Sequence, residues 1–274
     1  MFKHKINNIL FFIIVSIILI LTIIIINDNT PKIIYKVYSR DVVVEGYSEN
    51  IKNVEIKNVY EGKPVTGISR NAFENCQTLE TIIIPESVTL IGDLAFASCI
   101  NLKEAVLPNT ITFIGRRVFE SCYKLEKVNI PISVTDLPDE VFMNCISLKS
   151  IVIPESITRI PVRTFYGCSS LETVSFPSNL KQISKDSFTG CSNLLEIIIP
   201  DKVTMLESAF KNCTKLSSII LPSSLILFIS EGFSGCVNLQ TIKFKGTEEE
   251  WNELMKDHDI HEINNSRIEF DFAG

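Results

Sequence analysis

The chain has 274 residues, enough for one large domain or two ordinary ones. Apolar residues make up 46% of it, and glycine and proline each occur 11 times, so a substantial core is expected and wholesale disorder is excluded. The formal net charge of −6 argues against a nucleic-acid partner, because neutralising phosphates requires clustered lysine and arginine.

The first predicted element is a membrane-spanning helix over residues 9–26. These 18 residues contain no charged residue, proline or glycine, and as a helix they would span about 27 Å, close to the thickness of a bilayer's hydrocarbon core. Lys3 and Lys5 precede the stretch, and the next basic residue is Lys32. The positive-inside bias therefore places residues 1–8 in the cytoplasm and the rest of the chain outside the cell. We expect an uncleaved signal-anchor and a single-pass protein of the cell membrane.

Two alternatives exist for this segment. A cleaved signal peptide would release the protein, but its apolar region usually covers about 7–15 residues and ends in a small-x-small site. The run here is longer and ends in "INDNTP". A buried helix of a soluble core fits poorly with the uniform apolarity and the flanking lysines. Residues 27–40 are interpreted as a linker.

The rest of the chain is dominated by a tandem repeat. Eight frames place a phenylalanine three residues before a cysteine and a leucine three residues after it, and a proline follows seven of the cysteines by nine residues. The cysteines are spaced by 23, 23, 23, 23, 23, 22 and 23 residues. They are Cys76, Cys99, Cys122, Cys145, Cys168, Cys191, Cys213 and Cys236. Such registered columns predict a solenoid, because one unit is too small to bury its apolar residues without neighbours.

Each unit predicts one coil that contains a short strand. In "LKSIVIP" (residues 148–154) two inward apolar residues flank one outward position. This alternation is typical of a strand with one buried face, and the proline ends it because proline lacks the N–H of a continuing ladder. A second apolar pair, Ile157 and Ile160 in this unit, follows. The unit that is one residue short lacks it between Leu206 and Phe210, in a turn, so the core columns keep their register.

These columns resemble the BspA-like branch of the leucine-rich repeat family. The stretch "ITRIPVRTFYGCSSLETVSFPSNL" (157–180) carries the likeness most cleanly, and it covers about residues 40–250. Residues 46–68 resemble the half-repeat that opens such domains, and 246–251 resemble a segment after the last repeat in bacterial members. The resemblance implies a right-handed solenoid with a parallel sheet, mainly β with short turns or helical pieces. It also implies surface recognition or adhesion, with no catalytic residue and no cofactor.

Both ends of such a solenoid need caps, because an open end exposes the core and an unpaired sheet edge. Thr247 and Glu250 are typical of a capping box that starts a helix, whose Trp251 and Leu254 would cover the last coil. Residues 267–272 alternate like a final strand, and "RDVVVEGY" and "NVEIKNV" predict two strands that seal the first coil. We therefore assign 41–68 to an N-terminal cap, 69–245 to the solenoid and 246–274 to a C-terminal cap.

The eight cysteines could in principle be metal ligands or half-cystines. Structural zinc sites need close pairs such as C-x2-C, whereas the nearest pair here is 22 residues apart. Cysteines one coil apart would lie about 4.8 Å from each other, within the Cα range of a disulfide, but stacked side chains in one column point the same way. We interpret the column as a structural ladder of reduced, buried thiols.

Catalysis finds little support among the remaining residues. His258 and His261 lie in "DHDIHE", where a divalent-metal site is conceivable, but neither a third ligand nor an H-E-x-x-H spacing is present. The sequence also lacks G-x-S-x-G and a glycine-rich phosphate loop. We predict that the protein is not an enzyme and holds no metal.

The candidate binding site is the outward face of the predicted strands, about 35–40 Å long. Its apolar members are suited to recognition, although β-branched residues also suit the pleat of a strand without binding anything. The face comprises Thr81, Ile83, Glu104, Val106, Lys127, Asn129, Ser150, Val152, Thr173, Ser175, Glu196 and Ile198.

Two hypotheses for function follow from the anchor and the repeats. In the first, the protein is a membrane-anchored extracellular module that binds a protein or glycan through this face, without chemistry of its own. In the second, it is a structural or scaffold protein of the envelope that acts through self-association.

Overall fold

The computed structural model describes residues 32–48, 50–256, 263 and 266–270. The predicted membrane helix (9–26) and the "DHDIHE" stretch lie outside these ranges. Within them, no helix has the length and apolarity needed to cross a bilayer. The chain divides into two compact units, residues 1–32 and 33–274, and the description below concerns the second.

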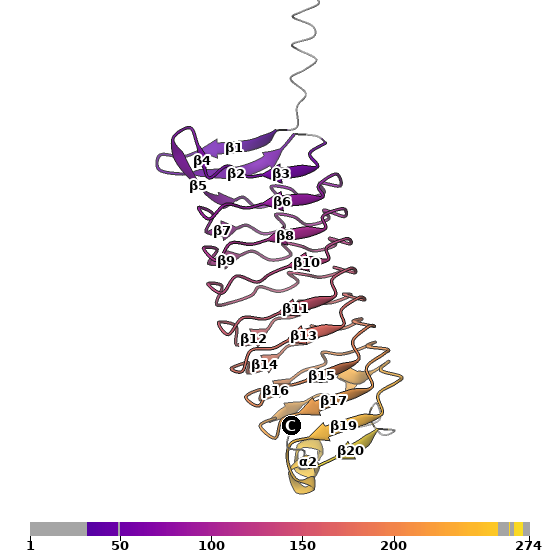
Figure 1. Cartoon of the computed structure of the whole chain (residues 1–274). Coiled ribbons are helices and arrows are strands. Elements are labelled where there is room, and N and C mark those ends of the chain that lie inside the picture. The colour runs from indigo at the N-terminus through magenta and orange to yellow at the C-terminus, as the bar shows by residue number, and fades with distance from the viewer. Residues whose placement is uncertain (1–31, 49, 257–262, 264–265, 271–274) are drawn as a thin grey trace, which may run out of the picture. The chain divides into compact units, whose positions relative to one another are not determined.

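The second unit is a solenoid of stacked coils, as predicted (Figure 1). Coil 1 begins at Phe73, and each later coil begins at the next phenylalanine of the column. The strands before the proline form what we call the first ladder. They are β3 (Asn53–Glu55), β6 (Thr81–Ile83), β8 (Glu104–Val106), β10 (Lys127–Val128), β11 (Ser150–Val152), β13 (Thr173–Ser175), β15 (Glu196–Ile198), β17 (Ser218–Leu221), β19 (Thr241–Phe244) and β20 (Arg267–Glu269).

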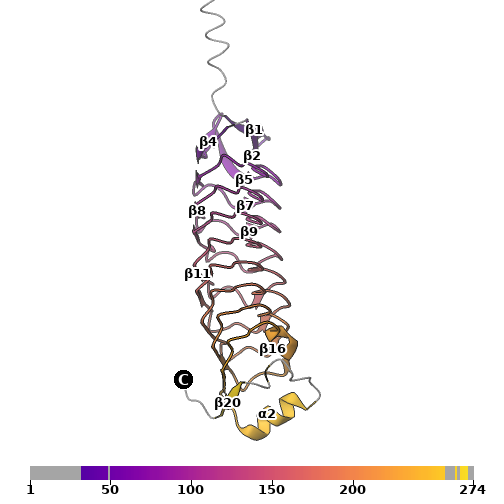
Figure 2. The same ribbon diagram turned by 90° about the vertical axis from the view of Figure 1, so that its right-hand side faces the viewer.

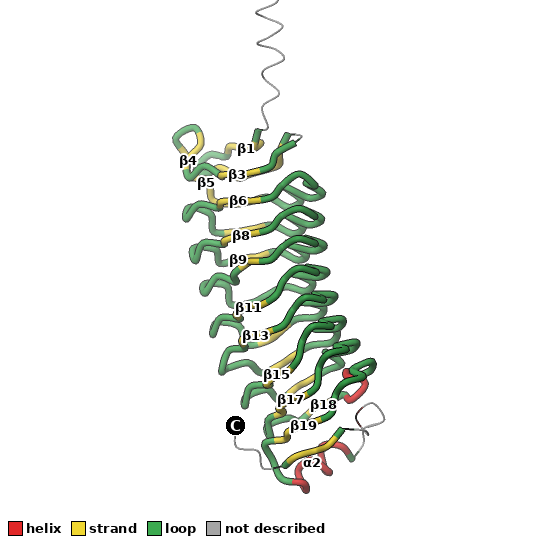
Figure 3. Tube along the Cα trace, turned by 45° about the vertical axis from the view of Figure 1, so that its right-hand side comes forward, coloured by secondary structure: helices red, strands yellow, loops and turns green. Residues whose placement is uncertain are grey.

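A second ladder runs along another side of the same coils. Its strands are β2 (Val42–Tyr47), β5 (Lys63–Ile68), β7 (Leu90–Ile91), β9 (Phe113–Ile114), β12 (Arg159–Ile160), β14 (Gln182–Ile183), β16 (Met205–Leu206) and β18 (Leu227–Phe228). Between consecutive coils the pairing in both ladders is parallel and joins equivalent positions, as in Thr81 with Glu104 and Gln182 with Met205. The strands are short, and most of each coil is loop (Figure 3).

The third side of each coil, which we call the turn side, carries the phenylalanine and the cysteine. Backbone hydrogen bonds again join successive coils here, for example from Asn75 N to Ala97 O at 2.8 Å. The residue before the cysteine has a positive φ in all eight units. It is asparagine or glycine, which tolerate that conformation well, in six units and serine in two. Another positive-φ residue lies two positions before each phenylalanine of the column from Phe96 to Phe188. The short coil has no such residue in its described turn, which explains how one position is lost without disturbing the core.

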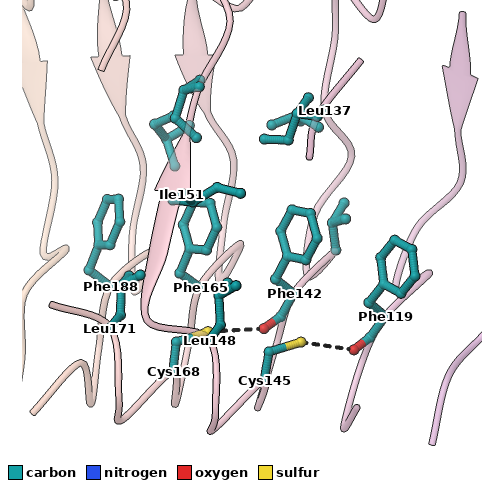
Figure 4. Close-up of a cluster of buried hydrophobic side chains, with 14 of the residues drawn as sticks. Phe119, Leu137, Phe142, Cys145, Leu148, Ile151, Phe165, Cys168, Leu171 and Phe188 are labelled. Carbon is teal, nitrogen blue, oxygen red and sulfur yellow. Dashed lines mark hydrogen bonds between the residues drawn. The ribbon is translucent and has the colours of Figure 1, made fainter. Parts of the chain in front are cut away.

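The core is a column of stacked phenylalanine rings, part of which is drawn in Figure 4. Successive rings from Phe73 to Phe233 lie 5.3–5.8 Å apart between centroids and are close to parallel. Tyr47 extends the stack at the N-terminal end, 5.9 Å from Phe73. At the other end Phe228 lies against Phe233 and Trp251. Aromatic residues of the caps therefore close a stack that the repeats alone would leave open.

The C-terminal cap has the predicted form. Helix α2 (Glu248–Met255) starts with a capping box between Thr247 and Glu250, and Trp251 on its inner face is buried. Figure 2 shows α2 beyond the last coils. Strand β20 adds to β19 in parallel, so the predicted final strand is also confirmed. One short 3-10 helix, Ser230–Phe233, precedes the last cysteine.

The N-terminal cap contains more strands than the sequence indicated. The two predicted strands correspond to β2 and β3, and β5 provides the partner for the first repeat. Strand β1 (Ile33–Val37) lies in the stretch interpreted as a linker and pairs antiparallel with β2. Strand β4 (Val59–Tyr60) pairs with β5 through a tight turn. The cap thus extends the second ladder by an antiparallel edge strand.

The ring stack predicts a large loss of stability when one ring is removed. Replacing Phe142 with alanine should lower the free energy of unfolding by about 3–5 kcal/mol, because the ring is fully buried between Phe119 and Phe165. Urea unfolding followed by circular dichroism measures this. Tyr123→Ala is the control: that ring is 43% exposed, so a change within about 0.5 kcal/mol is expected. Equal losses in both variants would contradict the stacked core.

Candidate functional site

The twelve residues of the predicted face all lie on the first ladder or directly beside it, and all are exposed. They alternate with inward residues such as Ile82, Ala105 and Ile151, which are buried. The alternation follows from the pleat, which sends successive side chains to opposite faces of a strand. The structure therefore brings these twelve residues together on one side of the solenoid.

The apolar members of this face are unusually open to solvent. Ile83 and Val106 are each 60% exposed, Val152 is 68% exposed and Ile198 is 54% exposed. The next residue of the column, Ile220, is only 6% exposed, so the exposed column ends at β15. An isolated exposed valine needs no explanation, but a column of β-branched residues along one face is a feature of binding surfaces.

Among the hollows on this face, two lie between coils whose first-ladder strands are not paired. A groove of about 660 Å³ between coils 3 and 4 is lined by residues that include Asn129, Ile132, Val152 and Glu155. A second hollow of about 530 Å³ lies between coils 5 and 6, where Phe176 contributes to the lining. Both mix apolar side chains with backbone and side-chain polar groups, as ligand sites do.

The hollows coincide with interruptions of the first ladder. Strands β10 and β11 are not hydrogen-bonded neighbours, nor are β13 and β15, whereas the other strands of this ladder form continuous sheets within the described residues. The coils before the two breaks have a polar outward position, with Asn129 and Ser175 in place of isoleucine or valine. Sequence reasoning included both residues in the face but missed the breaks that accompany them.

Asn129 has a specific structural role at the larger groove. Its Oδ1 accepts a hydrogen bond from Leu107 N, and its Nδ2 donates to Leu107 O, both at 2.8 Å. The side-chain amide thus replaces the backbone ladder between coils 2 and 3 at this position, and β10 ends one residue earlier, at Val128. The backbone of coil 3 consequently departs from that of coil 4 where the groove opens.

Ile132 is a groove residue that the sequence analysis missed. It occupies the position after the proline, where the preceding and following coils have Asn109 and Glu155. Those polar side chains accept hydrogen bonds from the next coil: Asn109 Oδ1 from Ile132 N, and Glu155 Oε1 from Ser178 N. Ile132 has no such capacity and is 65% exposed. One apolar residue in an otherwise polar column was the signal available in the sequence.

Charges of both signs border the face. Glu80 binds Lys52 and Lys103, each at 2.9 Å, and the hydrogen bond from Lys103, followed by that from Lys52, holds the pKa of Glu80 below its ordinary value. Exposed pairs of this kind contribute little to stability. No group of three potential metal-ligating side chains occurs in the part of the chain that the structure describes.

The eight cysteines form a column of buried thiols on the turn side, away from the groove. Seven of them donate from Sγ to the carbonyl oxygen of the preceding coil's phenylalanine, at 3.1–3.3 Å. Figure 4 shows two of these bonds, from Cys145 to Phe119 and from Cys168 to Phe142. The same carbonyl also accepts the backbone N–H of its own coil's cysteine, as Phe119 O does from Cys122 N. The thiol column is therefore part of the bonding between coils.

Burial makes these thiols hard to ionise. It raises the pKa of Cys168 to about 12, and it also raises the pKa of Cys99, Cys122, Cys145 and Cys191. For Cys213 a hydrogen bond with Cys236 raises the pKa first, and burial adds to the effect. Since the thiolate is the reactive form, the column is unsuited to nucleophilic or redox chemistry in the folded state.

Comparison with known proteins identifies one family. The family model of the BspA type leucine rich repeat region, in six copies, matches residues 46–149 and 135–255. No curated protein matches the chain.

Several solved structures are similar. A leucine rich cell surface protein from Faecalibacterium prausnitzii A2-165 is 26% identical with a TM-score of 0.50, and the match covers 75% of this chain and 63% of that one. The chain therefore spans less than two thirds of that protein. The pneumococcal vaccine antigen PcpA is 18% identical with a TM-score of 0.50, over 81% and 72% of the two chains, which shows a shared fold alone. A leucine-rich repeat protein from Bacteroides ovatus ATCC 8483 is 22% identical with a TM-score of 0.41, over 87% and 98%.

The raised thiol pKa values predict that the fold loses stability in alkali. An unfolded cysteine ionises near pH 8.5, whereas a buried one stays neutral, so each thiol's stabilisation is complete below that pH and declines above it. The expected loss is about 1.4 kcal/mol per pH unit for each such thiol, up to its folded pKa. Urea unfolding at pH 8, 9 and 10 measures the slope.

Cys145→Ser provides the matched control, because its hydroxyl can still donate to Phe119 O but does not titrate in this range. The slope of the free energy of unfolding against pH should fall by the contribution of one thiol, about 1.4 kcal/mol per pH unit. An unchanged slope would show that the thiols do not govern the alkaline transition.

Proposed function

The chain belongs to the BspA-type leucine-rich repeat family, and on this premise we propose that it is a non-catalytic cell-surface protein that recognises a protein or a glycan. The similarity to a leucine rich cell surface protein of Faecalibacterium prausnitzii supports the location. The apolar stretch 9–26 would serve as a single-pass membrane anchor, with residues 27–274 outside the cell. Adhesion to another cell or to a matrix is the expected consequence of such recognition.

The observation that carries this proposal is the outward face of the first ladder. Val152 and Ile132, 68% and 65% exposed, flank a groove of about 660 Å³ that also contains Asn129 and Glu155. Apolar side chains beside a small number of polar groups are the usual composition of a recognition site, since the first supply burial and the second supply orientation. The buried core beneath each coil would hold that coil's side chains in place without a ligand.

Charges around the face would orient a partner and speed its association more than they would increase its affinity. Lys127 and Ser150 adjoin the groove from coils 3 and 4, and Glu104 and Glu196 lie farther along the same column. A surface with both signs interspersed attracts neither nucleic acid nor an anionic membrane strongly. It suits a partner with its own mixed polar surface, such as a protein or a glycan.

Replacing Val152 with glutamate should weaken binding at least tenfold, because a charge would have to be desolvated in the centre of the contact. Binding of the full-length protein is measured on immobilised matrix proteins and glycans and on whole cells. Val237→Glu is the control, since Val237 is 79% exposed but lies on the turn side, directly after Cys236. Both variants should unfold like the wild type. Binding that survives Val152→Glu, or that is lost equally in both variants, would rule out this face.

Self-association is the second candidate, and the same exposed column favours it. Ile83, Val106, Val152 and Ile198 lie in one line, so two copies could cover each other's apolar side chains. Sedimentation velocity of a 31–274 fragment distinguishes the two functions. Oligomers that form with rising concentration and disappear on Val152→Glu, without any external ligand, support a scaffold, whereas a monomer at all concentrations supports recognition of a different molecule.

A further inference from the structure

Successive coils of the solenoid are joined on three sides: the first ladder, the second ladder and the turn side. Coils 1 and 2 show the complete pattern, with β6 on β8, β7 on β9, and Asn75 N bonded to Ala97 O. Coils 5 and 6 lack the first ladder but keep the second, through β14 and β16. Within the described coils, the junction between coils 3 and 4 is the one where both ladders stop.

Proline interrupts the second ladder. At its end a backbone N–H donates to the preceding coil, from Gly92 to Ile68 O and from Gly115 to Ile91 O at 2.8 Å, and from Ser184 to Ile160 O at 3.0 Å. The two intervening members of this column are Pro138 and Pro161, which have no N–H to donate. Coil 3 accordingly has no second-ladder strand, so that β9 of coil 2 is followed in this ladder by β12 of coil 4 (Figure 1).

The first ladder is interrupted at the same junction for a different reason. Strand β10 ends at Val128, because Asn129 turns its amide back to Leu107 of coil 2. Strand β11 pairs only with β13 of coil 5. Coil 3 is therefore bonded to coil 2 on this side, and coil 4 to coil 5, but the two are not bonded to each other.

The turn side stays continuous across the junction. Ser121 N donates to Met143 O at 2.8 Å, and the rings of Phe119 and Phe142 stack at 5.7 Å. Cys145 adds its thiol bond to Phe119 O at 3.1 Å.

On the second-ladder side, most of the contacts between coils 3 and 4 come from side chains, beside one backbone bond from Glu140 N to Val162 O at 3.1 Å. Ser156 Oγ donates to Val134 O at 2.6 Å, and Asp139 Oδ1 accepts from Val162 N at 3.2 Å. Ion pairs join Arg159 to Asp136 at 3.7 Å and Arg163 to Glu140 at 3.6 Å. Contacts through long, partly exposed side chains yield more readily than a backbone ladder.

We propose that this junction is a hinge, at which coils up to coil 3 and coils from coil 4 onward move as two blocks about the turn side. The groove on the first ladder opens on this junction: Asn129 and Ile132 belong to one block, and Val152 and Glu155 to the other. Movement about the turn side therefore changes the width of the groove. The hinge rests on the bonding between coils and is independent of the proposed function.

Native-state hydrogen exchange of the full chain at rising urea concentration tests the hinge. Amides of β7 and β9 should become accessible to exchange in one cooperative unfolding step, and amides of β14 and β16 in another. The boundary between the two unfolding blocks should lie between coils 3 and 4. Pro161→Ala restores an N–H that can reach Leu137 O across the junction. It should slow exchange there by about fivefold, the effect of one ordinary hydrogen bond, and bring the two steps closer together.

Pro177→Ala is the matched control, because Pro177 is also buried and the change in unfolded-chain entropy is the same, but it lies at the end of a first-ladder strand. It should leave the two steps separate. A single step in the wild type would overturn the hinge, as would a boundary between coils 5 and 6. Equal effects of Pro161→Ala and Pro177→Ala would also overturn the hinge, because the missing N–H of Pro161 would then not be what separates the two blocks.

Discussion

A coil of about 23 residues cannot satisfy its own backbone, because its short strands and turns point their N–H and C=O groups along the solenoid axis. Every such group must find its partner in the next coil at the equivalent position, and the register of the whole molecule follows from that requirement. The phenylalanine stack and the thiol column obey the same rule. Phe119 stacks on Phe142 because both belong to one column, and Phe119 O receives Cys145 Sγ for the same reason. Register between neighbours is thus the constraint on which the core depends.

Cysteine suits its column because it combines a small apolar volume with a weak donor. The position is fully buried from Cys99 to Cys213, so a side chain there must lose its hydration at little cost. The phenylalanine carbonyl that it reaches already accepts one backbone N–H, and the thiol supplies a second partner to the remaining lone pair. A charged residue could not be buried at this position. The chemistry of the thiol is therefore used for packing and not for reaction.

The columns of the core and the face of twelve residues could be predicted from the chain's own periodicity, and the capping box at Thr247 from its local sequence motif. The groove could not, because it depends on how one coil meets the next. Asn129 looked like one polar member of a strand face, and only its two bonds to Leu107 show that it ends β10. The antiparallel edge strand β1 was not predicted for a related reason. Its partner is β2 of the cap, which lies outside the repeat and follows no column.

Coil 3 concentrates the departures from the repeat. It has asparagine at an outward apolar position, isoleucine after the proline where neighbours are polar, and Pro138 where a ladder donor is needed. Each of these three residues weakens the bonding between coils or exposes apolar surface. None improves the core beneath, where Phe119 and Cys122 remain fully buried. Stability alone would favour the consensus residue at all three positions. Local violations that gather in one coil, two of them at the groove on the first ladder, are the pattern expected when function competes with stability. The same argument supports the proposed binding site at coils 3 and 4 without reference to any ligand.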